Sequence, residues 1–322
     1  MIISISSIRQ FKRCQRQWCF DQLFASAQVK NNPLRREAHI LSQFQSLAAW
    51  RGNLVDQVIS GKLIPALLKG WSLRRETLLA HARSLFDKQL AFALRNRVRE
   101  PGMRIKKAGD SFAALTMVEY GNKVNEEAIA QAWLDVERAL TNLLGMDELC
   151  NLLRSADQLI TQRSLLYSHF QVHFRAVPDL IAFFDEAAPL IVDWKVHAKG
   201  IHDYRLQLFA YAVALTRCKP HKDFPASLSR WSATDIRLLE VQLLTKQQRE
   251  YQPSEDDIAD IDDYVAETAV QMVMAVDGRS TREVDPFDFP VTANPEQCQW
   301  CAFHRICSEE AKCQEPEQMT LL

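Results

Sequence analysis

Two carboxylates and one lysine are the residues of this chain whose types and spacing could support hydrolysis. Asp193 and Lys195 are separated by a single residue, and Asp179 lies upstream, directly after Pro178. If residues 177–184 and 190–196 form antiparallel strands joined by the polar turn DEAA, Asp179 lies opposite residue 194. The two carboxylates and the ammonium then share one surface, although an ordinary salt bridge at a sheet edge would give the same pattern.

This acidic hairpin would support metal-assisted hydrolysis of a phosphodiester. Carboxylate oxygens are the ligands that hard cations such as Mg2+ and Mn2+ prefer. Such a cation polarises the phosphate and lowers the pKa of a bound water. The lysine would stabilise the negative charge that develops during the reaction, or position the nucleophile.

The cysteines near the end of the chain form a second candidate site. Three of the eight cysteines have the spacing C-x2-C-x5-C: Cys298, Cys301 and Cys307. In a reducing compartment such a group is more typical of metal ligands than of disulfides. Cys14, Cys19 and Cys313 are candidates for a fourth ligand, and the spacing is compatible with either zinc or an iron–sulfur cluster. We expect Cys150 and Cys218 to be buried apolar residues.

The surrounding periodicity predicts the elements that position these residues. Apolar residues recur with helical spacing over residues 6–24, 37–59, 72–99, 124–154, 202–217 and 254–277. Alternation with a period of two predicts strands in YSHFQVHFR (167–175), in the two arms of the acidic hairpin and in DIRLLEVQLL (235–244). Helices that precede, separate and follow strands indicate an α/β fold.

Composition limits the possible functions. The chain has 322 residues and a net charge of -1, so a nucleic-acid partner would have to bind a local basic patch. The basic run over 88–107 is one candidate, with a solvated helix face as the alternative. The chain contains no phosphate-binding G-x4-G-K-[ST] loop, which argues against an ATP-driven motor. We see neither a signal peptide nor a long apolar run, and expect a cytoplasmic protein that does not bind membranes.

Several motifs together resemble one enzyme family. Pro178-Asp179 followed by DWK, residues 193–195, resembles the pattern of PD-(D/E)XK nucleases. QLFAY, residues 207–211, is similar to the Q-x3-Y motif of the RecB-like branch, and its Gln207 and Tyr211 share a helix face. SSIRQFKRCQRQWCF resembles the opening of the iron–sulfur members of that branch, which include the AddB nuclease domain and CRISPR-associated adaptation nucleases.

The resemblance implies a site and its cofactors. It implies a catalytic set that consists of Asp179, Asp193, Lys195, Gln207 and Tyr211. It implies Mg2+ or Mn2+ ligands that consist of Asp56, Asp179, Asp193 and the Trp194 carbonyl. It implies a [4Fe-4S] cluster held by Cys14, Cys298, Cys301 and Cys307. The chain departs from the family at Asp56, four residues after Gly52, where the family usually has a metal-binding histidine, and at Gln15, which replaces a proline.

The resemblance also implies a fold and a function. We expect a single nuclease domain with a restriction-endonuclease-like core, in which helices flank a mixed central sheet. Its parts would be N-terminal helices (1–61), a helical insertion (62–155), the catalytic α/β core (156–250) and a C-terminal helix with the cysteine cluster (251–322).

We expect a metal-dependent DNA nuclease, an exonuclease in DNA repair, CRISPR adaptation or phage defence. Its substrate would be single-stranded DNA or DNA with single-stranded ends, and a separate helicase, integrase or defence-system protein would be its partner. The alternative is a non-cleaving iron–sulfur DNA-binding or scaffold subunit of a larger complex.

Overall fold

The computed structural model describes residues 1–26, 31–121, 125–197 and 204–307, and its centre is a mixed five-stranded sheet. In spatial order the strands are β2 (Gln158–Thr161), β5 (Leu180–Phe183), β6 (Leu190–Lys195), β7 (Arg237–Gln242) and β8 (Gln247–Tyr251). Strands β6 and β7 are parallel, and the other neighbours are antiparallel. The sheet and its helices confirm the predicted fold class, a restriction-endonuclease-like α/β core.

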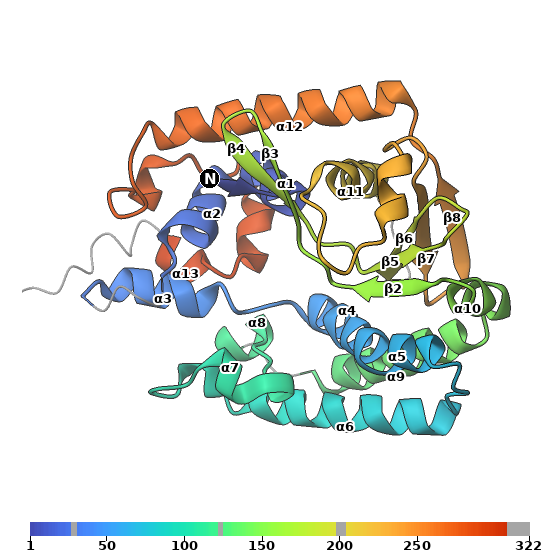
Figure 1. Ribbon diagram of the computed structural model, residues 1–322. Coiled ribbons are helices and arrows are strands. Elements are labelled where there is room, and N and C mark those ends of the chain that lie inside the picture. The colour runs from blue at the N-terminus through green and yellow to red at the C-terminus, as the bar shows by residue number, and fades with distance from the viewer. Residues whose placement is uncertain (27–30, 122–124, 198–203, 308–322) are drawn as a thin grey trace, which may run out of the picture.

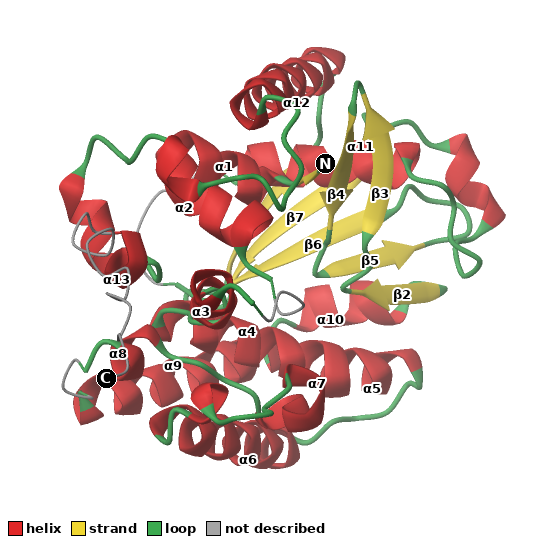
Figure 2. Ribbon diagram, turned by 90° about the vertical axis from the view of Figure 1, so that its left-hand side faces the viewer, coloured by secondary structure: helices red, strands yellow, loops and turns green. Residues whose placement is uncertain are grey.

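Helices cover both faces of this sheet (Figures 1 and 2). The layer on one face consists of α4 (Leu47–Val58), α5 (Ile64–Leu68), α6 (Arg75–Leu94), α9 (Glu126–Leu144) and α10 (Asp147–Arg154). The layer on the other face consists of α1 (Ile5–Arg13), α11 (Arg205–Arg217) and α12 (Glu255–Val276). Side chains therefore alternate along β6 between two apolar clusters, with Val192 in the first and Ile191 in the second.

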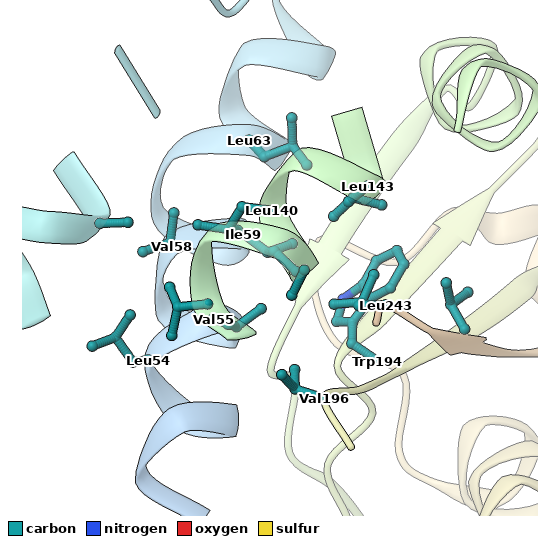
Figure 3. Packing of buried hydrophobic residues seen from close by; sticks show 14 of the residues in the cluster. Leu54, Val55, Val58, Ile59, Leu63, Leu140, Leu143, Trp194, Val196 and Leu243 are labelled. Carbon is teal, nitrogen blue, oxygen red and sulfur yellow. The ribbon is translucent and has the colours of Figure 1, made fainter. Parts of the chain in front are cut away.

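The first apolar cluster fixes α4 against β6. Val55 of α4, Ile59 directly after α4 and Leu140 of α9 are fully buried in the same cluster as Trp194 of β6, as Figure 3 shows. Full burial of an aliphatic side chain stabilises the fold by about 1.5–3 kcal/mol. Because Asp56 is next to Val55, this packing also determines where the Asp56 carboxylate lies.

The stretch 167–175, predicted as one strand, is in fact a hairpin. Strands β3 (Leu165–His169) and β4 (Val172–Ala176) pair with each other, and the short β1 (Ile2–Ile3) adds to β4 in a separate sheet. Phe170 lies in the two-residue turn with φ of 49° and is exposed. The alternation continues across so short a turn, and no glycine or asparagine marks it, so the period alone could not reveal the reversal.

Several predicted helices are divided in the structure. Residues 6–24 form α1, α2 (Gln15–Cys19) and a π-helical turn (Phe20–Phe24), with extended backbone at Cys14. Residues 37–59 comprise most of α3 (Pro33–Leu41) and all of α4, and 124–154 comprise α9 and α10. Short helices complete the described chain: Ile59–Leu63, Arg97–Arg99, α7 (Ile105–Ala108), Gly109–Ser111, α8 (Thr116–Glu119), Ala226–Arg230, Pro286–Asp288, Pro295–Trp300 and α13 (His304–Cys307).

The cysteine-bearing segment packs against the beginning of the chain. Phe303 stacks on Phe20 with ring centroids 5.4 Å apart, and both are buried in a third apolar cluster. Arg305 forms ion pairs with Glu37 and Glu119, and Arg99 binds the same two carboxylates. Apolar packing and a shared charge network therefore join segments far apart in the chain, and Arg305 and Glu37 are separated by 268 residues. None of the described helices is long and apolar enough to cross a membrane.

Candidate active site

The acidic hairpin forms with the predicted partners and a register shifted by one residue. Leu180 pairs with Val192, so Asp179, one residue before Leu180, lies beside Asp193 rather than opposite residue 194. The Trp194 amide donates a 2.8 Å hydrogen bond to Asp179 Oδ2. This bond fixes the Asp179 carboxylate against the backbone of β6.

Asp193 is the most buried carboxylate of the group, with 1% of its surface exposed. Its Oδ2 forms an ion pair with Lys195 Nζ, and its Oδ1 accepts a 3.3 Å hydrogen bond from Gln207 Nε2. Gln207 Nε2 also donates to Tyr211 Oη at 2.5 Å. Lys195 Nζ lies 4.2 Å from the centroid of the Tyr204 ring, a cation–π contact. Gln207 and Tyr211, both on α11, are thus linked to the Asp193 carboxylate through the Gln207 amide.

Gln162 joins Asp56 to the hairpin and was not anticipated from the sequence. Its Nε2 donates to Asp56 Oδ2 at 2.9 Å and to Asp179 Oδ1 at 3.1 Å. Two carboxylates from α4 and from the start of β5 therefore lie within reach of one amide nitrogen. Gln162 follows β2, a strand of only four residues that the sequence pattern did not predict, so no signal placed it here.

Glu240 is a second residue that sequence analysis missed. It lies beside Asp193 on the neighbouring strand β7 and is fully buried. It accepts hydrogen bonds from Gln242 Nε2 at 2.7 Å and from Tyr251 Oη at 3.1 Å. The single signal in the sequence was a charged residue inside an otherwise apolar strand pattern, because such a charge is costly without partners.

Burial raises the pKa values of the three aspartates, and repulsion from neighbouring carboxylates raises each of them further. Loss of hydration is the main cause for each, and Gln162 and Asp193 modify the pKa of Asp56, which is about 6. The charges of Asp193 and Asp56 further raise the pKa of Asp179. Lys195 lowers the pKa of Asp193, but burial and Glu240 keep it above the usual value. The site therefore favours any positive charge that enters it.

The residues fit a hard cation in donor chemistry. Asp56 Oδ1 is buried without a hydrogen-bond partner, and such an oxygen is costly unless a cation or proton neutralises it. Asp56, Asp179, Asp193 and Trp194 all line a cavity of about 390 Å³. Among the described residues, however, no three His, Cys, Asp or Glu side chains already stand as metal ligands. The Gln162 amide lies between two of the carboxylates and would have to move.

The structure brings together four of the cysteines. Cys14, Cys298, Cys301 and Cys307 line one cavity of about 300 Å³. Burial, together with the nearby Cys307, Cys14 and Cys298, raises the pKa of Cys301 to about 12. The uncharged form of the Cys301 thiol is thus favoured unless a metal ion compensates the thiolate charge.

The other cysteines are distributed as follows. Cys19 is fully buried in the apolar cluster of α1 and α11, away from this cavity, which leaves Cys14 as the residue near the N-terminus that could join the group. Cys150 and Cys218 are buried, as predicted. Cys313 lies outside the described residues.

The basic run over 88–107 does not form one open surface. Arg99 binds Glu37 and Glu119, and Arg97 binds Glu100 at 3.0 Å. Only part of the run, such as Lys106 and Lys107, is exposed and forms no ion pair with a carboxylate of the described residues. The run therefore contributes partly to the contacts that attach the cysteine-bearing segment, an interpretation that the sequence did not suggest.

Comparison with known proteins found one family model that matches most of the chain. A family model described as PD-(D/E)XK nuclease superfamily matches residues 2–308. Among solved structures, the crystal structure of SSO0001 is 15% identical, with a TM-score of 0.30 over 71% of this chain and 96% of that chain. Protein VC1899 from Vibrio cholerae is 14% identical, with a TM-score of 0.22 over 74% of this chain and 60% of that chain. No curated protein matches the chain.

The raised pKa of Asp56 predicts how stability depends on pH in the presence of a chelator. A carboxyl group whose pKa is higher in the folded state than in the unfolded state stabilises the fold fully at a pH below the ordinary aspartate pKa. For Asp56 this stabilisation is lost as pH rises through about 6. Asp56→Asn should therefore stabilise the chelated protein by about 1–3 kcal/mol near pH 8 and by little near pH 4, because one pKa unit corresponds to about 1.4 kcal/mol.

Urea unfolding at the two pH values measures this difference. Asp260→Asn is the matched control, because Asp260 is exposed on α12 and should show no comparable pH-dependent gain. Equal effects of Asp56→Asn on the free energy of unfolding at both pH values would show that burial does not raise the pKa of Asp56.

Proposed function

The chain belongs to the PD-(D/E)XK nuclease superfamily, and we propose that it is a metal-dependent nuclease that hydrolyses the phosphodiester bonds of DNA. One observation carries the proposal. Asp56, Asp179, Asp193 and Lys195, from three separate elements and two different layers, line the same cavity. Charges are rarely buried together unless they bind one another or a cation, and of these three carboxylates Asp193 forms an ion pair with Lys195.

The proposed mechanism assigns a task to each side chain. Asp56, Asp179 and Asp193 would hold a Mg2+ or Mn2+ ion, with the Trp194 carbonyl as a further ligand. When bound, the cation supplies Lewis acidity and a water of lowered pKa. Lys195, held by Asp193, would stabilise the negative charge that develops on the phosphate.

The α11 residues would orient this arrangement. The Gln207 amide holds Asp193 Oδ1, and the Tyr211 hydroxyl in turn contacts the same amide. The Trp194 indole packs in the apolar cluster on the opposite face and keeps the strand end rigid (Figure 3). The contact of Gln207 with Asp193 supports assignment to the RecB-like branch, and with it an exonuclease acting on DNA ends.

The residue type at position 56 favours a second candidate function. A carboxylate at this position, where a histidine is usual, motivates a non-cleaving DNA-binding or scaffold subunit. Against this candidate, Asp56 shares Gln162 with Asp179 and points into the acidic cavity. Aspartate is moreover a suitable ligand for hard cations.

Cleavage assays with matched variants distinguish the two candidates. The parent should cut linear single-stranded or double-stranded DNA with Mn2+ and stop when EDTA is added. Asp193→Asn and Lys195→Ala should each lower the rate by at least about a hundredfold, because each removes charge that acts on the reacting phosphate.

Asp260→Asn, on the exposed face of α12, should cut like the parent. Cutting of linear but not of closed circular DNA would identify an exonuclease. A pure parent protein that cuts none of these substrates with Mg2+ or Mn2+ would favour the scaffold, and parental rates in Asp193→Asn would refute the assigned site.

We further propose that the four-cysteine cavity holds a [4Fe-4S] cluster. The cavity gathers four thiols from both ends of the chain, and Cys14 reaches it because the backbone between α1 and α2 is extended there. A cluster would restrict the unfolded chain by closing a very long loop, so its role would be structural. Zinc bound by the same four thiolates is the competing occupant.

Iron content measures the occupant directly. Protein purified without oxygen should be brown and contain about four irons per chain, the content of a cubane cluster with cysteine ligands. Cys14→Ala should lose both iron and solubility, whereas Cys313→Ala should retain them. A colourless preparation with about one zinc per chain would show that the site is a zinc site.

A further inference from the structure

A second, basic cavity adjoins the acidic one. It measures about 210 Å³ and is lined by the start of α1, by β4 with the segment that follows it, and by α11. Arg9 and Arg175 belong to its lining, and no carboxylate is among the described residues that line it. Helix α11 contacts both α1 and strand β4, and the three elements lie together in Figure 1. The cavity is thus a positively charged neighbour of an acidic centre.

Gln207 forms the boundary between the two cavities. Its side chain lines both of them, and its amide contacts Asp193 on the acidic side and Tyr211, which lines the basic side. A ligand in the basic cavity would therefore be next to the group that reacts in the acidic cavity.

The basic cavity is also continuous with a larger one. Ser4 and Arg175 line both the basic cavity and a cavity of about 620 Å³ that extends toward the end of α12. Shared residues thus connect three cavities in sequence, with the acidic centre at one end. A DNA strand that leaves the acidic centre could follow this line of cavities.

The donors of the basic cavity suit a phosphate group. Arg175 is exposed, and within the described residues its guanidinium makes no hydrogen bond or ion pair. Guanidinium groups match phosphate geometry through paired N–H donors. The first turn of α1, which includes Ser6, faces the same cavity, and the positive end of the helix dipole adds to the favourable potential.

We propose that this cavity binds a phosphate of the substrate strand that neighbours the scissile phosphate, with Arg9 and Arg175 as its ligands. The proposal rests on the nuclease function proposed above and adds to it a residue pair that determines how the strand is held. The bound group is a phosphodiester within the strand or a phosphate at its end.

Arg175→Gln tests the cavity without any need for cleavage. Binding of a labelled single-stranded oligonucleotide is measured by fluorescence anisotropy in EDTA over a range of salt concentrations. The variant should bind about tenfold more weakly, which is typical for the loss of one charge-assisted hydrogen bond. The slope of log affinity against log salt should become shallower by about 0.7, the value for one phosphate contact on a single strand.

Two further variants control the experiment. Arg175→Glu reverses the charge and should weaken binding more than Arg175→Gln. Arg138→Gln removes an exposed arginine from α9, in the layer on the other face of the sheet, and should keep the affinity and salt slope of the parent. Circular dichroism of each variant should match the parent, since both arginines are exposed.

Oligonucleotides with a 5′-phosphate or a 5′-hydroxyl distinguish the two sources of the phosphate. An equal loss of affinity for both identifies a phosphate within the strand, and a loss confined to the phosphorylated oligonucleotide identifies a terminal phosphate. If both Arg175 variants keep the parent's slope of log affinity against log salt, and the parent cuts DNA, the proposed phosphate site is wrong and the nuclease function stands. A parent that binds DNA through Arg175 but cuts none would overturn the nuclease function alone.

Discussion

Like charges lose hydration and repel each other when they are buried together, and three aspartates at the ends of β5, β6 and α4 meet this condition. Their arrangement persists because the rest of the fold determines it. The pairing of β5 with β6 places Asp179 beside Asp193, and apolar packing of α4 beneath the sheet brings Asp56 to the same point. Lys195 and Gln162 offset part of the repulsion through an ion pair and two hydrogen bonds.

Each layer of the protein therefore contributes residues to the acidic cavity or to its immediate surroundings. The layer containing α4 and α9 supplies Asp56 and the apolar support for Trp194 (Figure 3). The layer containing α11 supplies Gln207 and Tyr211, and with α1 it forms the basic cavity next to the acidic one. The packing between the two ends of the chain, around Phe20 and Phe303, closes the side of the molecule that carries four cysteines.

Much of this arrangement could be predicted from the sequence, for identifiable reasons. The arms of the acidic hairpin are apolar, alternate regularly and flank a polar turn, so the register was correct to within one residue. Gln162 could not be predicted, because β2 is four residues long and its pairing with β5 is a tertiary contact. Glu240 was visible as a charge in a strand, but only the parallel pairing of β6 with β7 shows that it lies beside Asp193. The β3–β4 hairpin was missed because its turn contains no typical turn residue.

The central claim is that the three aspartates form one cation site, and diffraction at the manganese absorption edge tests it most directly. Crystals grown with Mn2+ should give an anomalous peak between the carboxylates of Asp56, Asp179 and Asp193, with the Gln162 amide displaced from its present hydrogen bonds. A cavity without such a peak, in which Gln162 still bridges Asp56 and Asp179, would contradict the account.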